Sequence, residues 1–305
     1  MPGIVLAIFG PTASGKTAVA EQIARRISAT AVSADSMQVY RGLPLLTAQP
    51  QTPTRLVGIW GLETEASVGA YATLAHAAVD ATLANGRTPI VAGGTGLYFR
   101  AALTELGLPP ASTPETRLQL EAVYDRLGAR RTHDVLSARD PEAAARIHPN
   151  DRRRVVRALE LTETGASLVH RHDSLWSDAY RRPTLVVGLD VPKDELERRI
   201  IERTKAIFAA GVVEEARAAL AGPLSSTARQ VIGLREIAEL PADEARDAIV
   251  VRTRRLAAYQ RKWMRRIPGL ATVAADRPPG EIADAILDME RSWERLSPHG
   301  RAARA

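Results

Sequence analysis

The clearest chemical pattern in the sequence is GPTASGKT, at residues 10–17. Gly10, Gly15, Lys16 and Thr17 satisfy G-x-x-x-x-G-K-[ST], in which a glycine-rich backbone wraps a phosphate at the start of a helix. The lysine supplies a point charge to the outer phosphate, and the threonine hydroxyl is a ligand for Mg²⁺. We therefore expect a diphosphate or triphosphate to bind the whole loop, which consists of Gly10, Pro11, Thr12, Ala13, Ser14, Gly15, Lys16 and Thr17. The alternative is a plain glycine turn between a strand and a helix.

Asp35 and Thr95 are further residues whose types suit a reaction at such a loop. Each follows a short apolar segment, as the loop does, and we expect Ser36 and Arg100, which lie near them in the sequence, to reach the same crevice. An aspartate in this position can accept a proton from a substrate. The alternatives are that Asp35 only caps the N-terminus of a helix, and that the GGTG stretch around Thr95 is only a tight turn.

The segments around these residues alternate between predicted strands and predicted helices. Buried strands are predicted at 3–9, 30–35 and 88–94, and helices at 15–27 and 67–86. This alternation is typical of a parallel sheet with crossover helices, in which ligands bind beyond the carboxyl ends of the strands. We therefore predict an α/β fold, a P-loop NTPase-like parallel sheet with flanking helices, whose strand ends converge on one crevice.

The phosphate loop does not by itself indicate a nucleotide. Hydrolysis of nucleotides usually also requires an acidic residue after an apolar strand, where it holds the magnesium. The apolar segment 88–92 instead leads into GGTG, without an acid. This is an argument against a motor protein or a GTPase.

The alternation stops near residue 107, which predicts an inserted lobe. Residues 107–182 are rich in arginine and have only helical patterns, whereas strand character returns at 184–191. Later elements are predicted as helices at 193–221, 227–239, 243–267 and 280–295, with a strand at 270–275. We therefore predict a catalytic core formed by residues 1–106 and 183–296, an all-helical lobe at 107–182, and a disordered tail at 297–305.

Composition and charge limit the class of protein. Apolar residues make up 45% of the 305 residues and charged residues 25%, values that are ordinary for a soluble protein. We expect no membrane association and a cytoplasmic location, because the sequence has neither a signal peptide nor a run of about 20 apolar residues. A monomer is the default expectation for the oligomeric state. The absence of cysteine excludes disulfides and thiolate metal sites.

The chain carries a net charge of +6, and only four of its 41 basic residues are lysines. Arginine suits bidentate contacts to phosphate, although GC-rich coding produces the same bias. Two clusters stand out, one at 151–157 and one at 252–266, where seven basic residues occur without an acid. In the second cluster Leu256, Trp263, Met264 and Ile267 fall on one arc of a helix, which predicts a buried stripe with cations on either side. Both clusters suit an RNA phosphate track, and solvated basic faces are the alternative.

His170 and His172 are spaced as some metal-binding pairs are. No third ligand accompanies them in the sequence, so we do not expect a metal site there.

Five blocks of the sequence resemble the tRNA dimethylallyltransferases, also called tRNA isopentenyltransferases. The blocks are GPTASGKT, DSMQVYRGL, GGTGLY, IHPNDRRRVVRALE and TRRLAAYQRKWMRR, and the resemblance covers roughly residues 3–268. The resemblance implies transfer of a dimethylallyl group from dimethylallyl diphosphate to N6 of the adenosine 3′-adjacent to the anticodon, with release of diphosphate. It also implies Mg²⁺ as cofactor and the tRNA anticodon stem-loop as partner, gripped by the inserted lobe.

The resemblance assigns roles to particular residues. Lys16, together with magnesium held by Thr17, would stabilise the departing diphosphate. Asp35 would orient the adenosine amine and take its proton, and Thr95 would contact the tRNA; Lys16, Asp35 and Thr95 are thus the expected catalytic residues. The residues expected to bind tRNA are Asp35, Ser36, Met37, Gln38, Thr95, Arg117, Arg153, Arg154, Arg157, Arg252, Arg255 and Lys262.

Two segments depart from the family pattern, PLLTAQP at 44–50 and RLVGIWGLE at 55–63. They lie near the expected acceptor side and leave the donor loop intact, so they bear on the choice of tRNA and the rate. Two other hypotheses remain at this point. A small-molecule kinase would use the same loop on ATP, and an RNA-binding protein would retain a decayed site.

Overall fold

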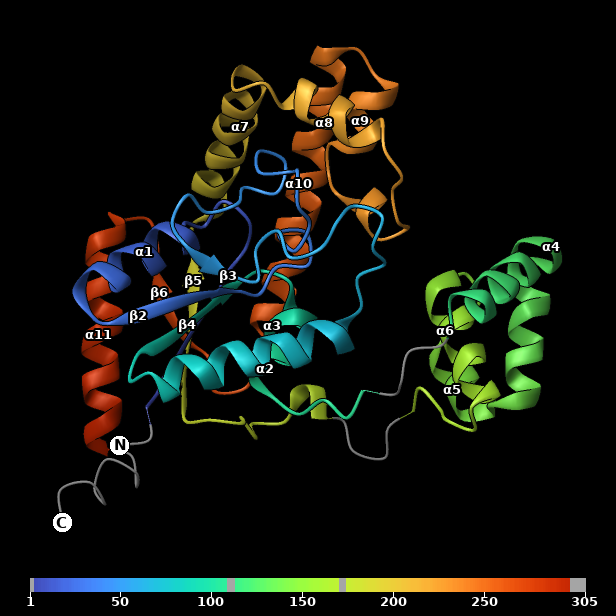
Figure 1. Ribbon diagram of the computed structural model, residues 1–305, viewed down its shortest axis with the longest axis horizontal. Helices are drawn as coiled ribbons and strands as arrows, with labels where there is room; N and C mark the ends of the chain where they lie inside the picture. Colours follow the sequence, from blue (N-terminus) through green and yellow to red (C-terminus); the bar gives the residue numbers. More distant parts are fainter. Residues whose placement is uncertain (1–2, 109–112, 170–173, 297–305) are drawn as a thin grey trace. The chain divides into compact units, whose positions relative to one another are not determined.

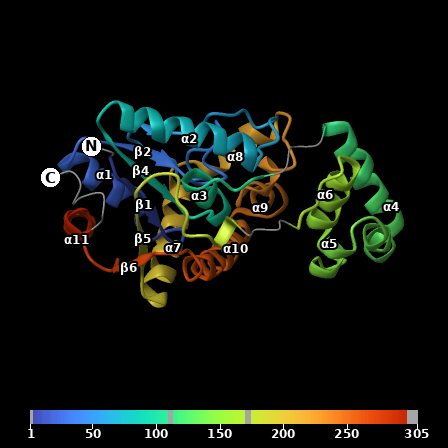
Figure 2. The ribbon, with the colours of Figure 1, turned by 90° about the horizontal axis from the view of Figure 1, so that it is seen from below.

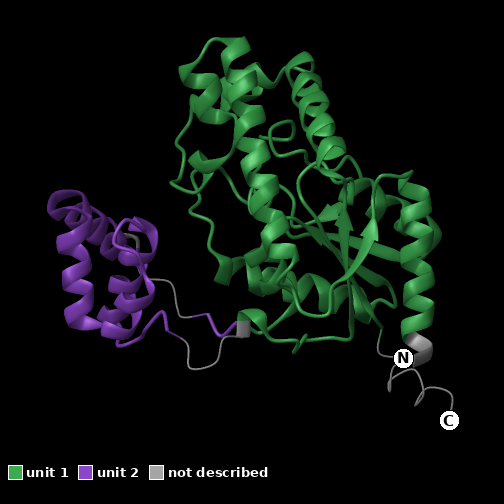
Figure 3. Cartoon of the chain, turned by 180° about the vertical axis from the view of Figure 1, so that it is seen from behind, with its two compact units in different colours: residues 1–105, 175–305 green, residues 106–174 purple. Residues whose placement is uncertain are grey.

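The computed structural model describes residues 3–108, 113–169 and 174–296. They divide into two compact units, residues 1–105 with 175–305 and residues 106–174 (Figure 3). The first unit contains the sheet, the phosphate loop and Asp35, so it positions the candidate site. No helix in the described ranges is long and apolar enough to cross a membrane.

The first unit is built on a parallel six-stranded sheet in the order β3-β2-β4-β1-β5-β6 (Figure 1). The strands are β1 Val5–Phe9, β2 Ala29–Ser33, β3 Thr54–Arg55, β4 Thr88–Gly93, β5 Thr184–Asp190 and β6 Ala271–Ala274. β1 lies inside the sheet and is buried along its whole length, as expected for a parallel strand that is covered on both faces. The predicted α/β class and parallel sheet are therefore confirmed.

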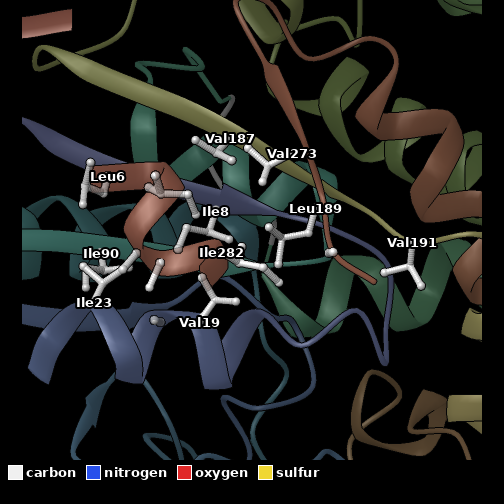
Figure 4. Packing of buried hydrophobic residues seen from close by; sticks show 14 of the residues in the cluster. Leu6, Ile8, Val19, Ile23, Ile90, Val187, Leu189, Val191, Val273 and Ile282 are labelled. Atoms are coloured by element: carbon white, nitrogen blue, oxygen red, sulfur yellow. The ribbon is translucent and has the colours of Figure 1, made fainter. Parts of the chain in front are cut away.

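Alternating side chains of β1 face two different layers of helices. Leu6 and Ile8 pack with α1 (Lys16–Arg26) and α11 (Pro279–Leu296), as Figure 4 shows. Phe9 points to the other face, where its ring lies 5.1 Å from Phe99 of α3 (Gly96–Leu103). On that face α3 lies between α2 (Val68–Ala84) and α10 (Ala242–Met264) and contacts both (Figure 2).

The remaining helices of this unit are α7 Lys193–Ala209, α8 Val212–Leu220 and α9 Leu234–Glu239, with short 3-10 turns at Ala228–Gln230 and Ser174–Trp176. The prediction of one helix over 193–221 was wrong. Gly211 has a φ of 93° and ends the first helix, because a left-handed residue cannot continue a right-handed helix. Similarly, the predicted helix at 227–239 is interrupted at Gly233, where φ is 108°.

The second unit is entirely helical, with α4 Pro114–Arg139, α5 Pro141–Arg146 and α6 Arg152–Glu163. Leu136, Val155 and Leu159 are among the residues of its own buried core, so it has the internal packing of a separate lobe. Gly128, with a φ of 78°, interrupts the regular geometry of α4.

The lobe ends earlier than the sequence predicted, at Ser174 and not at residue 182. The segment that follows is fixed to the first unit by Arg100, a fully buried residue that donates hydrogen bonds to the carbonyls of Leu175 and Ser177, at 2.7 and 2.5 Å. Arg181 adds an ion pair with Glu105 at 2.6 Å. These contacts draw residues 175–182 into the first unit, whereas composition alone had grouped them with the helices. The tail predicted at 297–305 lies outside the described residues.

Candidate active site

The phosphate loop connects β1 to the first turn of α1. Gly15 has a φ of 90°, a left-handed conformation that suits glycine, and Ala13 shares this conformation with a φ of 63°. At Gly10 a Cβ atom would lie 2.7 Å from the Ser14 hydroxyl and 3.4 Å from the carbonyl oxygen of Leu189, so the loop closes tightly on itself at this residue. Ser14 is buried, and its Oγ has no hydrogen-bond partner among the described residues. The loop therefore has the curled backbone and the spare donor that a phosphate ligand would use.

Lys16 is the central cation of the loop. Its Nζ donates a hydrogen bond to the carbonyl of Pro11 at 2.7 Å, which folds the side chain back over the loop. Desolvation lowers the pKa of Lys16 to about 8; the charge of Asp35 opposes this shift and that of Arg203 adds to it. The negative charge of a bound diphosphate would favour the protonated form of Lys16.

Arg203, from α7, is a second cation at the loop that the sequence patterns did not reveal. Its Nη1 donates to Thr12 Oγ1 at 2.7 Å. Burial lowers the pKa of Arg203, and the charge of Asp35 opposes that shift. Arg203 lies in a helix far downstream of the loop, and no spacing in the sequence distinguishes it from its many arginine neighbours.

Asp35 lies just beyond the carboxyl end of β2. Its Oδ1 accepts a hydrogen bond from the backbone amide of Met37 at 2.9 Å, and residues 36–39 form a turn and not a helix. The alternative that Asp35 caps a helix is therefore wrong. The second carboxylate oxygen has no hydrogen-bond partner among the described residues and remains available to a substrate proton.

Thr95 is joined directly to the Asp35 turn. The backbone amide of Ser36 donates to Thr95 Oγ1 at 3.2 Å, and the two hydroxyls are also 3.2 Å apart. This approach is possible because Gly93 ends β4, where a Cβ atom would lie 2.1 Å from the carbonyl oxygen of Ala34. Thr95 occupies the N-cap position of α3 but makes no capping bond with its side chain, so its hydroxyl serves the neighbouring strand end instead.

Met37 and Gln38 complete the turn, but their side chains are engaged within the protein. Met37 packs against a buried cluster that includes Leu43. The Gln38 amide donates to the carbonyl of Ala48 at 2.9 Å, while its Oε1 accepts from Ser33 at 2.7 Å. Arg100, which was expected to reach the crevice, is buried and donates hydrogen bonds to the carbonyls of Leu175 and Ser177, so that expectation was wrong.

The C-terminal half of α10 forms one wall of the loop. Gln260 is buried, and its Oε1 accepts a hydrogen bond from the backbone amide of Thr12 at 2.7 Å. Cβ atoms at Gly94 and Gly96 would lie 2.4 Å from Gln260 and 2.1 Å from the ring of Trp263. Because Gly94 and Gly96 lack side chains, α10 can pack beside the strand ends. A tight turn alone would not require glycine for this packing.

The buried stripe predicted on this helix was partly wrong. Its most buried residues are Ala245, Ile249, Val250, Ala257 and Gln260, whereas Leu256 is 37% exposed. Arg252 forms an ion pair with the buried Glu236 at 2.6 Å. Arg255 and Lys262 are exposed, and neither has an ionic partner in the described part of the chain.

The basic residues of the second unit separate into two groups. Arg153 and Arg154 are exposed at the start of α6, and Arg154 lies 3.5 Å from Asp151, which caps the helix. Arg157 and Arg117 instead face the buried Glu160, at 2.8 and 3.9 Å. The latter two arginines therefore contribute to the packing of the lobe.

A magnesium site is compatible with the residues present. Thr17 is exposed on the first turn of α1, beside Lys16, and offers one hydroxyl. No cluster of three or more acidic or histidine residues suited to a metal occurs among the described residues. This donor set fits a Mg²⁺ ion held mainly by ligand phosphates and water, with one protein hydroxyl. His170 and His172 lie outside the described residues.

A cavity of about 510 Å³ opens beside Thr17, Ser33 and Gln38. Its remaining wall comes mainly from α1, β2 and residues 50–55, and includes Ala20 and Ala31. Lys16 and Asp35 are not among the residues that line it, and Thr17 is the residue through which the cavity adjoins the phosphate loop.

Comparison with known proteins agrees with the motifs. The family model described as IPP transferase matches residues 38–267, and that described as isopentenyl transferase matches residues 3–56. The chain is 41% identical to a tRNA dimethylallyltransferase of Anaeromyxobacter sp. over 93% of its length and 97% of the relative's. It is 39% identical to the tRNA dimethylallyltransferase of Salinispora arenicola, over 93% and 86%.

Solved structures give the same result. The tRNA isopentenylpyrophosphate transferase of Bacillus halodurans superposes with a TM-score of 0.69 at 30% identity, over 96% of this chain and 97% of that one. A eukaryotic dimethylallyltransferase acting on tRNA has a similar fold, with a TM-score of 0.73 at 23% identity, over 98% and 77%. These comparisons confirm the predicted family and give no support to the kinase alternative.

Proposed function

This chain belongs to the tRNA dimethylallyltransferase family, and from that premise we propose that it prenylates tRNA. The reaction is transfer of a dimethylallyl group from dimethylallyl diphosphate to N6 of the adenosine 3′-adjacent to the anticodon, with release of diphosphate. The observation that carries the proposal is the meeting of opposite charges at one sheet edge. Lys16 and Arg203 donate hydrogen bonds to Pro11 and Thr12 of the phosphate loop, Asp35 lies at the neighbouring strand end, and its charge acts on both cations.

The reaction breaks one bond and forms another. The C–O bond between the allylic carbon and the diphosphate breaks, and its electron pair leaves with the diphosphate. Negative charge therefore grows on the leaving group, where Lys16, Arg203 and the loop amides stabilise it. The N6 lone pair forms the new C–N bond, and the proton lost from nitrogen passes to the carboxylate of Asp35.

Asp35 and Thr95 also have positioning roles in this proposal. The hydrogen bond from Met37 holds one carboxylate oxygen, which leaves the other to face the amine. The Thr95 and Ser36 hydroxyls form the adjoining surface, where they are suited to hydrogen-bond the nucleoside. An adenosine must leave its stack to reach such a crevice, which costs a few kcal/mol and less in a loop than in a duplex.

We include Mg²⁺ in the proposal, held by the Thr17 hydroxyl and the donor phosphates. When bound, it would neutralise charge on the leaving diphosphate. For tRNA, the exposed Arg153, Arg154, Arg255 and Lys262 are the best candidates for phosphate contacts. Arg117, Arg157 and Arg252, which were also expected there, have carboxylate partners within the protein. A tRNA substrate would place the enzyme in the cytoplasm, and a monomeric state remains a prediction.

The test is a labelling assay with two donors side by side. Protein with Mg²⁺ is given unmodified tRNA and either labelled dimethylallyl diphosphate or labelled ATP. We expect label on tRNA from the prenyl donor only. Asp35→Asn, which keeps an oxygen for the Met37 amide, should lower the single-turnover rate by about 10²–10⁴-fold. Steady ATP turnover without tRNA labelling would contradict the proposal, and an unchanged Asp35→Asn rate would remove the assigned base.

A further inference from the structure

One face of α10 remains exposed beside the candidate site. Val251, Arg255, Tyr259, Lys262 and Arg266 are spaced by four, four, three and four residues, which places them on a single stripe of the helix. All five are exposed, and the segment 248–266 contains no acid. Tyr259 is 57% exposed, more than the other exposed large hydrophobic residues of this helix, Val251 at 43% and Leu256 at 37%.

Tyr259 is the outer member of a chain of stacked side chains, the aromatic ladder, which comprises Tyr259, Trp263, Trp176 and Arg266. The Tyr259 ring meets Trp263 edge to face, with centroids 6.5 Å apart and an interplanar angle of 74°. Trp263 is tilted against Trp176 at 4.9 Å, and the Arg266 guanidinium lies 3.7 Å from the centre of the Trp176 ring. These contacts make the exposed ring a supported platform.

The inner part of the ladder reaches the candidate site. Trp263 packs against the backbone at Gly96, the residue after Thr95. Gln260, next to Tyr259 in the chain, receives the Thr12 amide of the phosphate loop. The platform is therefore within about one helical turn of the residues that contact both the loop and the acceptor strand end.

We propose that the Tyr259 ring is a stacking site for an unpaired RNA base, distinct from the crevice that receives the reacting adenosine. The inference rests on the proposed function, because the base would come from the same anticodon loop. Aromatic rings bind bases of any identity through their faces, and cations beside them contact the backbone. Arg255 and Lys262 lie on the same stripe on either side of Tyr259, without ionic partners in the described part of the chain, and match the charge of two flanking phosphates.

The test compares Tyr259→Leu with Tyr259→Phe in the full-length protein. The probe is an anticodon stem-loop RNA carrying the fluorescent base 2-aminopurine at one unpaired position other than the target adenosine, titrated without prenyl donor. We expect quenching on binding by the wild type and by Tyr259→Phe at one such position, and its loss in Tyr259→Leu. In the labelling assay, Tyr259→Leu should raise KM for tRNA by about tenfold, with kcat and KM for the donor unchanged.

Controls separate the possible failures. Leu256→Ala, at an exposed apolar residue of the same helix outside the stripe, should leave quenching and KM unchanged. The inference would be overturned if Tyr259→Leu kept the RNA affinity and the quenching of the wild type. It would also be overturned if Tyr259→Phe bound as weakly as Tyr259→Leu, because the hydroxyl would then be the contact. Failure of the wild type to label tRNA would instead contradict the proposed function, whereas the fluorescence titration needs no catalysis.

Discussion

Each cation at the phosphate loop is held in surroundings that disfavour its charge. Burial lowers the pKa values of both Lys16 and Arg203, and each is near the other. Among the described residues, Asp35 is the carboxylate whose charge opposes these shifts in both groups. A ligand that brings several negative charges would relieve this imbalance, so the free loop favours an anionic ligand, such as the proposed diphosphate, over a neutral molecule.

The low pKa of Lys16 predicts that, as pH rises, the affinity for diphosphate falls while the free energy of unfolding increases. The free loop loses the Lys16 charge as pH rises through about 8, so the affinity for diphosphate should weaken above that value, toward tenfold per unit. The unfolded chain binds this proton up to its ordinary pKa of 10.5, so the contribution of Lys16 to the free energy of unfolding should rise with pH between about 8 and 10.5.

Titration calorimetry with diphosphate and Mg²⁺ between pH 7 and 9.5 measures the first effect. Lys16→Arg is the matched control, since arginine stays charged over this range and shares every other ionisation with the wild type. The ratio of the two affinities at each pH reports the titration of Lys16 alone. Parallel pH profiles for the two proteins would show that Lys16 does not titrate in this window.

At the scale of elements, the site depends on how closely α10 approaches the strand ends. Gly96 lies against the Trp263 ring, and any side chain there would have to displace an aromatic group held by other rings. We expect Gly96→Ala to lower the free energy of unfolding by about 1–3 kcal/mol and to reduce prenyl transfer, because α3 and α10 must separate. Denaturant unfolding monitored by tryptophan fluorescence measures the first effect.

Gly69→Ala is the comparison variant. Gly69 lies in the first turn of α2, with ordinary backbone angles and open space where the new methyl group would be. Alanine should there be neutral or slightly stabilising, since it restricts the unfolded chain. If Gly96→Ala were equally harmless, the close packing of α10 against α3 would not be what holds this wall of the site.

The sequence predicted this level of structure unevenly. The phosphate loop, β1 and the strand ends at Asp35 and Thr95 were foreseen, because each depends on a local pattern that the structure retains. The buried stripe in the segment 252–267 was foreseen only in part, because Ile267 is buried as expected, whereas the buried residues within 252–266 are Ala257 and Gln260, and small or polar residues do not mark an apolar stripe. Arg203 and Arg100 were missed or misplaced for a related reason, since only tertiary structure decides which of 37 arginines is buried.

For the whole molecule, the inserted lobe was predicted from the loss of strand patterns, and the structure contains a separate helical unit there. Its C-terminal boundary could not be predicted, since residues 175–182 have no regular pattern that distinguishes them from the lobe. They belong to the first unit through Arg100 and Arg181, whose partners are distant in sequence. Exposed cations lie in both units. If one tRNA contacts cations of both units, its affinity depends on the whole chain.

Salt dependence tests this directly. Each phosphate contact contributes about one unit to the slope of log affinity against log salt. Arg153→Gln, in the second unit, and Arg255→Gln, in the first, should each reduce the slope by about one, and the double variant by about two. Additive losses require that one tRNA touches both units at the same time, because independent binding to either unit alone would leave a slope set by the stronger unit.

Two further arginine variants are controls for the salt slopes. Arg235→Gln removes an exposed charge that Glu239 already pairs at 3.0 Å, so it should leave the slope unchanged. Arg157→Gln should instead lower the free energy of unfolding, by about 1–3 kcal/mol, because it deprives the buried Glu160 of its nearer partner. Filter binding of tRNA at several salt concentrations, with unfolding measured in parallel, separates the two effects. A slope that is indifferent to both Arg153 and Arg255 would mean that neither arginine contacts a phosphate, and their place in the proposed phosphate track would be wrong.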